Sequence, residues 1–138
     1  MAFPPGATHP VVHVEYPDWT DRIADWARSY GSDAERMQLA IALARSNVER
    51  GSGGPFGAAI FEAGSGRLVA VGMNSVVRLN NCTLHAEMMA FMMAQQRVGS
   101  FTLSAPGLPE HELADFFETF HEDAELVSRV QAGIATPG

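Results

Sequence analysis

The sequence predicts an α/β domain, and three observations support this prediction. Apolar residues recur at helical spacing in two stretches, residues 37–48 and 84–95. Between them, two short apolar runs (55–62 and 67–74) are separated by the turn Ala63-Gly64-Ser65-Gly66, which is typical of a β-hairpin. The chain has 138 residues, of which 46% are hydrophobic and 18% charged, and this suits one domain with a single packed core.

Composition narrows the classes of function. The net charge is −7, and all nine basic side chains are arginines scattered singly along the chain. Because nucleic-acid-binding proteins usually carry basic patches, a small neutral substrate suits this surface better than RNA or DNA. No apolar run reaches membrane-spanning length and the first residues resemble no secretory signal, so we expect a cytoplasmic protein without membrane contact. The single cysteine, Cys82, excludes an internal disulfide and an all-cysteine metal site within one chain.

The N-terminal half divides into an arm and two helices. Residues 1–17 contain four prolines and should form an extended arm across the domain or across a partner subunit. Residues 18–138 are expected to form a single domain that begins with a helix over 18–30. Ser32 or Asp33 then caps a second helix, which ends at the breaker Gly51-Ser52-Gly53-Gly54.

The C-terminal half centres on a helix that the sequence predicts after Thr83 as its N-cap. Its expected stripe, at spacings of three and four, comprises Leu84, Met88, Phe91, Met92 and Gln95, and the helix should end near Gly99. Residues 101–103 suggest a third short strand. Apolar residues at helical spacing, with an acidic opposite face, predict a long amphipathic helix over 110–132.

The start of the central helix is the strongest functional signal. His85 and Glu87 stand two residues apart there, directly after a polar loop. A histidine and a carboxylate in this arrangement are half of a device in which a metal activates water and a carboxylate carries protons. A plain helix-terminal histidine and a first-turn carboxylate that interacts with the helix dipole are the simpler alternatives.

The ordered motifs resemble the zinc-dependent cytidine-deaminase-like superfamily. They run from a helix through Gly-Gly-Pro-Phe-Gly-Ala, a second strand that ends in Gly-x-Asn, and a Thr-x-His-Ala-Glu helix, over residues 37–99. Pro55-Phe56-Gly57-Ala58 and Asn74-Ser75-Val76 are most similar to the guanine deaminase branch, and tRNA adenosine deaminases come next. The resemblance implies a three-layer α/β/α arrangement with a curtailed mixed sheet.

The resemblance also implies a role for each residue of the site. His85 would be a zinc ligand and Glu87 the proton shuttle. Asn74 and the backbone N–H of Ala86 would hydrogen-bond a purine or pyrimidine base, and Phe56 would wall the pocket. For Asn74, a turn residue at the end of a strand explains the sequence equally well.

The chain departs from the family after about residue 105. It has no Pro-Cys-x-x-Cys element, and its end is either divergent and shortened or in a different reading frame. Carboxylates and imidazole also bind zinc, so Asp115 with Glu118, His121 with Asp123 or Glu125, Cys82, or a partner chain are alternatives for completing the site. We favour the simpler interpretation that the acidic residues form the solvated face of a helix.

Two principal hypotheses follow for the function. The first is zinc-dependent hydrolytic deamination of a small nucleobase or nucleoside, and the alternative is a catalytically inactive deaminase fold that serves binding or oligomer assembly. A tRNA-editing subunit is a weaker third hypothesis because the chain lacks a basic patch. A small sheet with an unpaired edge favours pairing with a second subunit, so we expect a homo-oligomer, and specifically a dimer. The stripe Phe116, Phe117 and Phe120 should form part of its interface.

Overall fold

A computed structural model describes residues 5, 6 and 8–103 and the backbone of residues 117–122. The elements, in chain order, are α1 (Thr20–Ile23), α2 (Asp33–Glu49), β1 (Phe56–Phe61), β2 (Leu68–Met73), α3 (Ala86–Val98) and β3 (Phe117–Glu122). Within these residues, no helix has both the length and the apolar character needed to cross a bilayer.

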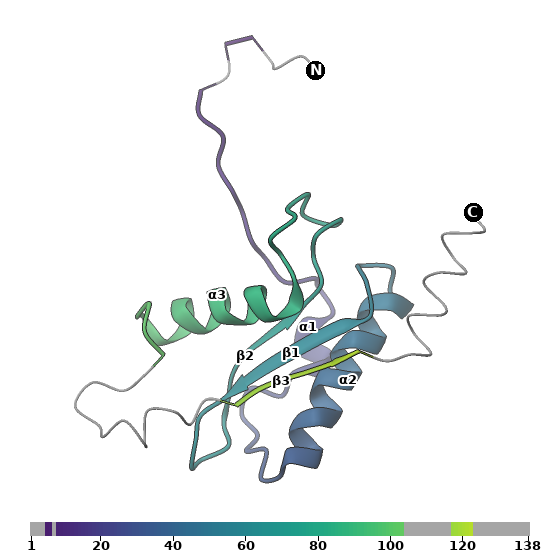
Figure 1. The fold of residues 1–138 in the computed structure, drawn as a ribbon, viewed down its shortest axis with the longest axis vertical. Coiled ribbons are helices and arrows are strands. Elements are labelled where there is room, and N and C mark those ends of the chain that lie inside the picture. Colours follow the sequence, from purple (N-terminus) through teal and green to yellow (C-terminus); the bar gives the residue numbers. More distant parts are fainter. Residues whose placement is uncertain (1–4, 7, 104–116, 123–138) are drawn as a thin grey trace.

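The strands form one sheet between two helices (Figure 1). The strand order is β2-β1-β3, α2 packs on one face, and α3 packs on the other. This confirms the expected α/β architecture with three layers. Both observed pairings are antiparallel, so the described strands do not include the parallel pair that a mixed sheet requires.

The register of the β1–β2 hairpin explains the two cores. Ala59 pairs with Val71, and both belong to the apolar cluster beneath α2. Ala58 pairs with Gly72 on the opposite face, where the alanines of α3 pack. Both strands are therefore buried on both sides, as their almost continuous apolar sequence predicts.

Helix α3 buries a different face from the one that its largest apolar residues predict. Its buried residues are Ala86, Met89, Ala90 and Ala94, whereas Met88 of the expected stripe is 43% exposed. The reason is the close approach of α3 to β2, which only small side chains permit. A Cβ on Gly72 would lie 2.7 Å from the backbone nitrogen of Ala90 and closer still to the carbonyl oxygen of Ala86.

The predicted ends of the helices are partly correct. The Ser32 hydroxyl accepts a hydrogen bond from the Glu35 N–H, which confirms the cap of α2. The predicted N-cap of α3 is wrong: His85 occupies this position, and the Thr83 hydroxyl donates to the Asn81 side chain instead. Gly99, in the left-handed conformation, ends α3 as expected.

The predicted helix over residues 18–30 is only four residues long in the structure. Ala24 is extended, and the side chain of Asp25 accepts a hydrogen bond from the Ala27 N–H. Such local bonds from an aspartate compete with helical hydrogen bonding and favour a turn.

Two predictions for the chain after α3 are wrong where the structure describes the residues. Residues 101–103 form no strand, and Phe101 is 85% exposed. The predicted helix over 110–132 is wrong for residues 117–122, which form β3 and pair with all of β1. Pairing satisfies the backbone groups along β1, and this tertiary gain outweighs the helical spacing of the apolar residues. The rest of that prediction falls outside the described residues.

The last part of the arm contacts the domain, whereas residues 8–13 are exposed and their trace leads away from the helices and the sheet (Figure 1). The Tyr16 hydroxyl donates to the Val71 carbonyl (2.7 Å) and accepts from the Val71 N–H (3.2 Å). Tyr16 therefore satisfies both backbone groups of a residue on the outer edge of β2, where another strand would otherwise pair. Burial raises the pKa of this hydroxyl.

Candidate active site

A hydrogen-bonded loop joins β2 to α3 and brings its two ends together. The Ser75 N–H donates to the Leu84 carbonyl at 2.9 Å, and Leu84 is fully buried. Asn74 and His85 are the residues immediately outside this bond. Eleven positions apart in sequence, they are neighbours at one end of the sheet.

Phe56 joins the same end of the sheet from β1. The Asn74 N–H donates to the Phe56 carbonyl at 3.2 Å, so the end of β2 is paired with the start of β1. Both side chains are half-buried. The structure therefore brings Phe56, Asn74 and His85 to one region, and the roles expected for them stay predictions.

The N-terminus of α3 completes this region. His85 is the exposed N-cap, Ala86 is buried against β2, and Glu87 is half-buried in the first turn. The first N–H groups of a helix have no acceptor within the helix, and they carry partial positive charge. This end of α3 thus offers backbone donors beside an imidazole and a carboxylate, a suitable set for a polar planar ligand.

A second network, which the sequence analysis missed, holds Asn74 in place. Asn47 of α2 is fully buried, and its side-chain amide donates to the carbonyls of Gly54 and Asn74 at 2.9 Å each. Its side-chain oxygen accepts from the Ser52 hydroxyl, which accepts from the Trp19 indole N–H. The available signal was a polar residue on the buried face of a helix, just before a glycine-rich breaker.

Arg78 ties the loop to the arm. Its guanidinium donates to the Ser75 hydroxyl (2.9 Å) and to the Glu15 carbonyl (2.8 Å). Burial lowers the pKa of Arg78, an effect that nearby Glu15 partly opposes. The residue after Asn74 is thereby anchored from the arm side as well.

The described residues do not supply a complete set of zinc ligands. His85 is present, but no group of three or more His, Cys, Asp or Glu side chains is placed to hold a metal within this part of the chain. Cys82 is exposed in the loop. Asp115, Asp123 and Glu125 lie outside the described residues, and only the backbone of Glu118 and His121 is described. His121 pairs with Gly57, next to Phe56, whereas Glu118 pairs farther along β1 with Ile60.

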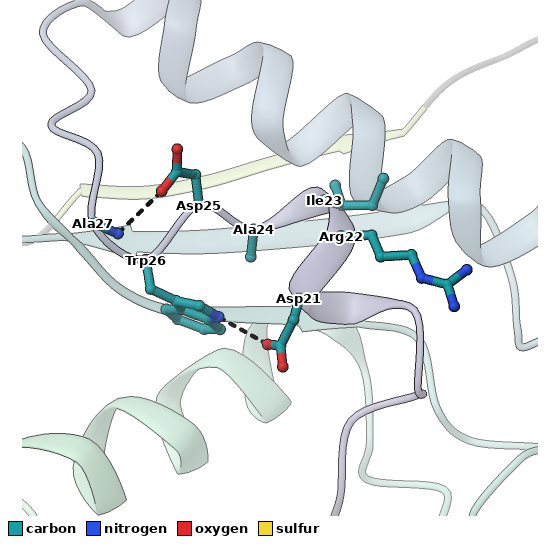
Figure 2. Close-up of a pocket in the computed structure, with 7 residues that line it drawn as sticks. All are labelled: Asp21, Arg22, Ile23, Ala24, Asp25, Trp26 and Ala27. Atoms are coloured by element: carbon teal, nitrogen blue, oxygen red, sulfur yellow. Dashed lines mark hydrogen bonds between the residues drawn. The ribbon is translucent and has the colours of Figure 1, made fainter.

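A separate open hollow of about 440 Å³ is lined by residues 21–27 (Figure 2). The Trp26 indole N–H donates to the Asp21 carboxylate there (Figure 2). The Arg97 guanidinium lies over the Trp26 ring, 5.0 Å from its centroid. Because Arg97 is in the last turn of α3, this hollow lies at the opposite end of the helix from His85. It brings together none of the expected site residues.

Comparisons with known proteins point to one family. A model of the cytidine and deoxycytidylate deaminase zinc-binding region matches residues 31–130. Guanine deaminase of Bacillus subtilis (strain 168) is 39% identical over 67 residues, which are 49% of this chain and 42% of that protein.

Solved structures give the same picture. Guanine deaminase from Nitrosomonas europaea superposes with a TM-score of 0.66 at 35% identity, over 75% of this chain and 57% of that one. The structure of the Bacillus subtilis guanine deaminase gives a TM-score of 0.54 at 26% identity, over 72% of this chain and 57% of that one.

The chain thus spans about half the length of these relatives. The family model, however, covers most of the chain, including the described elements from α2 to β3. This chain belongs to the cytidine and deoxycytidylate deaminase family.

Proposed function

We propose that this chain deaminates a small nucleobase hydrolytically, with guanine as the first substrate to test. The observation that carries the proposal is the Ser75–Leu84 hydrogen bond, which places Asn74 beside His85 at the start of α3. Similarity to guanine deaminases supports the choice of base.

Glu87 is the proton shuttle in this proposal. Its carboxylate takes a proton from water, the resulting hydroxide bonds to the amidine carbon of the base, and the carbon–nitrogen bond to the amino group breaks. Glu87 delivers this proton to the ring nitrogen, then takes the remaining proton of the new hydroxyl group and delivers it to the leaving amine, so that a carbonyl forms, one water is consumed and one ammonia is released.

The remaining residues hold the base. The side chain of Asn74 donates to and accepts from its polar edge, the N–H of Ala86 donates to it, and Phe56 walls one side. Both polar groups are on residues whose backbone is fixed by the closed loop, so they orient the base at a small cost in conformational entropy.

Zinc is the cofactor of this proposal, with His85 as its ligand from the described residues and with the remaining ligands on other residues or on a partner subunit. Bound zinc lowers the pKa of its water toward neutrality.

We also propose that the protein is a cytoplasmic homodimer. Light scattering at micromolar concentration tests the oligomeric state directly.

The test combines metal analysis with ammonia release from guanine, cytosine and adenine. Glu87→Gln should lower kcat at least ~100-fold, the usual scale for a general acid–base group. Glu62→Gln, the same change at an exposed carboxylate beside the hairpin turn, should leave kcat unchanged. His85→Ala should lose zinc, whereas His13→Ala in the arm should retain it. Absence of turnover on every base, in protein that has been supplied with zinc, would rule out the enzymatic proposal.

A second candidate function is a non-catalytic deaminase fold that serves assembly. It is favoured by the absence of a three-ligand cluster from the described residues. Under this alternative the purified chain binds no zinc, Glu87→Gln changes nothing measurable, and any oligomer survives chelation.

A further inference from the structure

We infer that Asn47 is a positioning residue for the base-binding side chain of Asn74. This inference rests on the proposed function, in which Asn74 holds the base. Asn47 lies on α2, which contributes none of the site residues that the sequence predicts, and it acts through the backbone rather than by contact with substrate.

A directional chain of hydrogen bonds reaches Asn74 from the core. The Trp19 indole donates to the Ser52 hydroxyl (3.0 Å), which donates to the Asn47 side-chain oxygen (2.8 Å). The Asn47 amide then donates to the carbonyls of Gly54 and Asn74. Because Trp19 is only 2% exposed and Asn47 is fully buried, water cannot substitute for a missing donor without rearrangement.

The glycine turn after α2 packs closely against the Asn47 amide and the Asn74 carbonyl. A Cβ on Gly53 would lie 2.6 Å from the Asn47 amide nitrogen and closer still to the Asn74 carbonyl oxygen. A Cβ on Gly54 would lie 3.5 Å from the Phe56 ring and 3.8 Å from the side-chain carbon of Asn74. The glycine turn therefore packs closely against both the Asn47 amide and the end of β2. This contact lies beside the side chains of Phe56 and Asn74, which line the proposed base site.

The side chain at position 47 must accept a hydrogen bond from Ser52 and donate to the carbonyls of Gly54 and Asn74, and the amide of asparagine does both. An aspartate keeps the shape and can still accept from Ser52. Its second oxygen, however, would face two carbonyl oxygens at the present 2.9 Å, and these contacts would be repulsive. Asn47→Asp should therefore displace the Asn74 backbone while the volume of the side chain stays the same.

The kinetic test is a double-mutant cycle of Asn47→Asp and Asn74→Ala on guanine turnover. We expect Asn47→Asp alone to raise KM roughly tenfold, the scale of one lost neutral hydrogen bond, with a smaller change in kcat. In the Asn74→Ala background, Asn47→Asp should raise KM no further, since the residue it positions is gone. Full additivity of the two effects would overturn the inference.

Leu39→Ala is the matched control, since Leu39 is buried two turns earlier on the same helix and its apolar side chain makes none of the hydrogen bonds of the network. It should destabilise the fold without the same rise in KM. Equal rises in KM for Leu39→Ala and Asn47→Asp would mean that general loosening explains the effect, and would also overturn the inference.

Amide hydrogen exchange gives a readout that does not need activity. The Asn74 N–H, bonded to the Phe56 carbonyl, should exchange at least ~10-fold faster in Asn47→Asp than in Leu39→Ala at equal global stability. If no base is turned over, the proposed function fails while exchange still tests the positioning. Unchanged protection at Asn74 would then refute the role of Asn47.

Discussion

Gly72→Ala is the most direct test of how the site is built, because this glycine sets the distance between α3 and β2. Its φ angle is not in the left-handed region, so alanine meets no backbone penalty, and the effect of the change is steric. The new Cβ would stand 2.7 Å from the Ala90 nitrogen and closer still to the Ala86 carbonyl oxygen. Both obstacles are backbone atoms, which cannot rotate away as a side chain can.

The expected loss of stability follows from this geometry. Overpacking by one methyl group usually costs about 1–3 kcal/mol, and a clash with helical backbone belongs at the upper end. Because α3 carries His85, Ala86 and Glu87, its retreat from the sheet also moves the proposed catalytic groups. A displacement of ~1 Å can lower turnover about 100-fold.

Urea denaturation and guanine turnover measure the two effects. Gly31→Ala is the control, because its Cβ would have no neighbour closer than 3.7 Å and its φ angle also lies outside the left-handed region. This control should leave stability unchanged or raise it by up to ~1 kcal/mol through the unfolded state. A Gly72→Ala protein that unfolds at the same urea concentration as the parent would refute the close-packing argument.

Two further predictions concern the arm and α2. Burial raises the pKa of Tyr16, so the folded protein holds this proton more tightly than the unfolded chain, in which tyrosine titrates near ~10. Its contribution to stability is therefore complete below about pH 10 and declines as the pH rises further. Tyr16→Phe should flatten this decline in pH-dependent denaturation, leaving the contribution of Tyr30, whose pKa burial also raises. Ser32→Ala should lower the free energy of unfolding by about 1 kcal/mol because it removes the cap of α2, and thermal denaturation with no change in midpoint would contradict this role.

Local patterns in the sequence determined the hairpin, the cap of α2 and the end of α3. Each of these depends on residues close together in the chain: two short apolar strands around a glycine turn, a serine before a helix, a glycine after one. The order of the motifs also placed Phe56 in the first strand, Asn74 at the end of the second and Glu87 in the first turn of the helix, whereas His85 is the N-cap of that helix. The family followed from that order, because ordered spacing survives even when a later element is missing.

Tertiary structure alone decided the rest. Helical periodicity assigned Met88 to the core, but α3 turns its alanines inward since Gly72 lets the backbones meet. The same periodicity assigned residues 117–122 to a helix, whereas hydrogen bonds to β1 make them a strand. Asn47 reaches Asn74 across 27 positions of sequence, and no local pattern encodes such a contact. Close approach and long-range hydrogen bonding depend on which surfaces finally meet, and only the folded chain determines that.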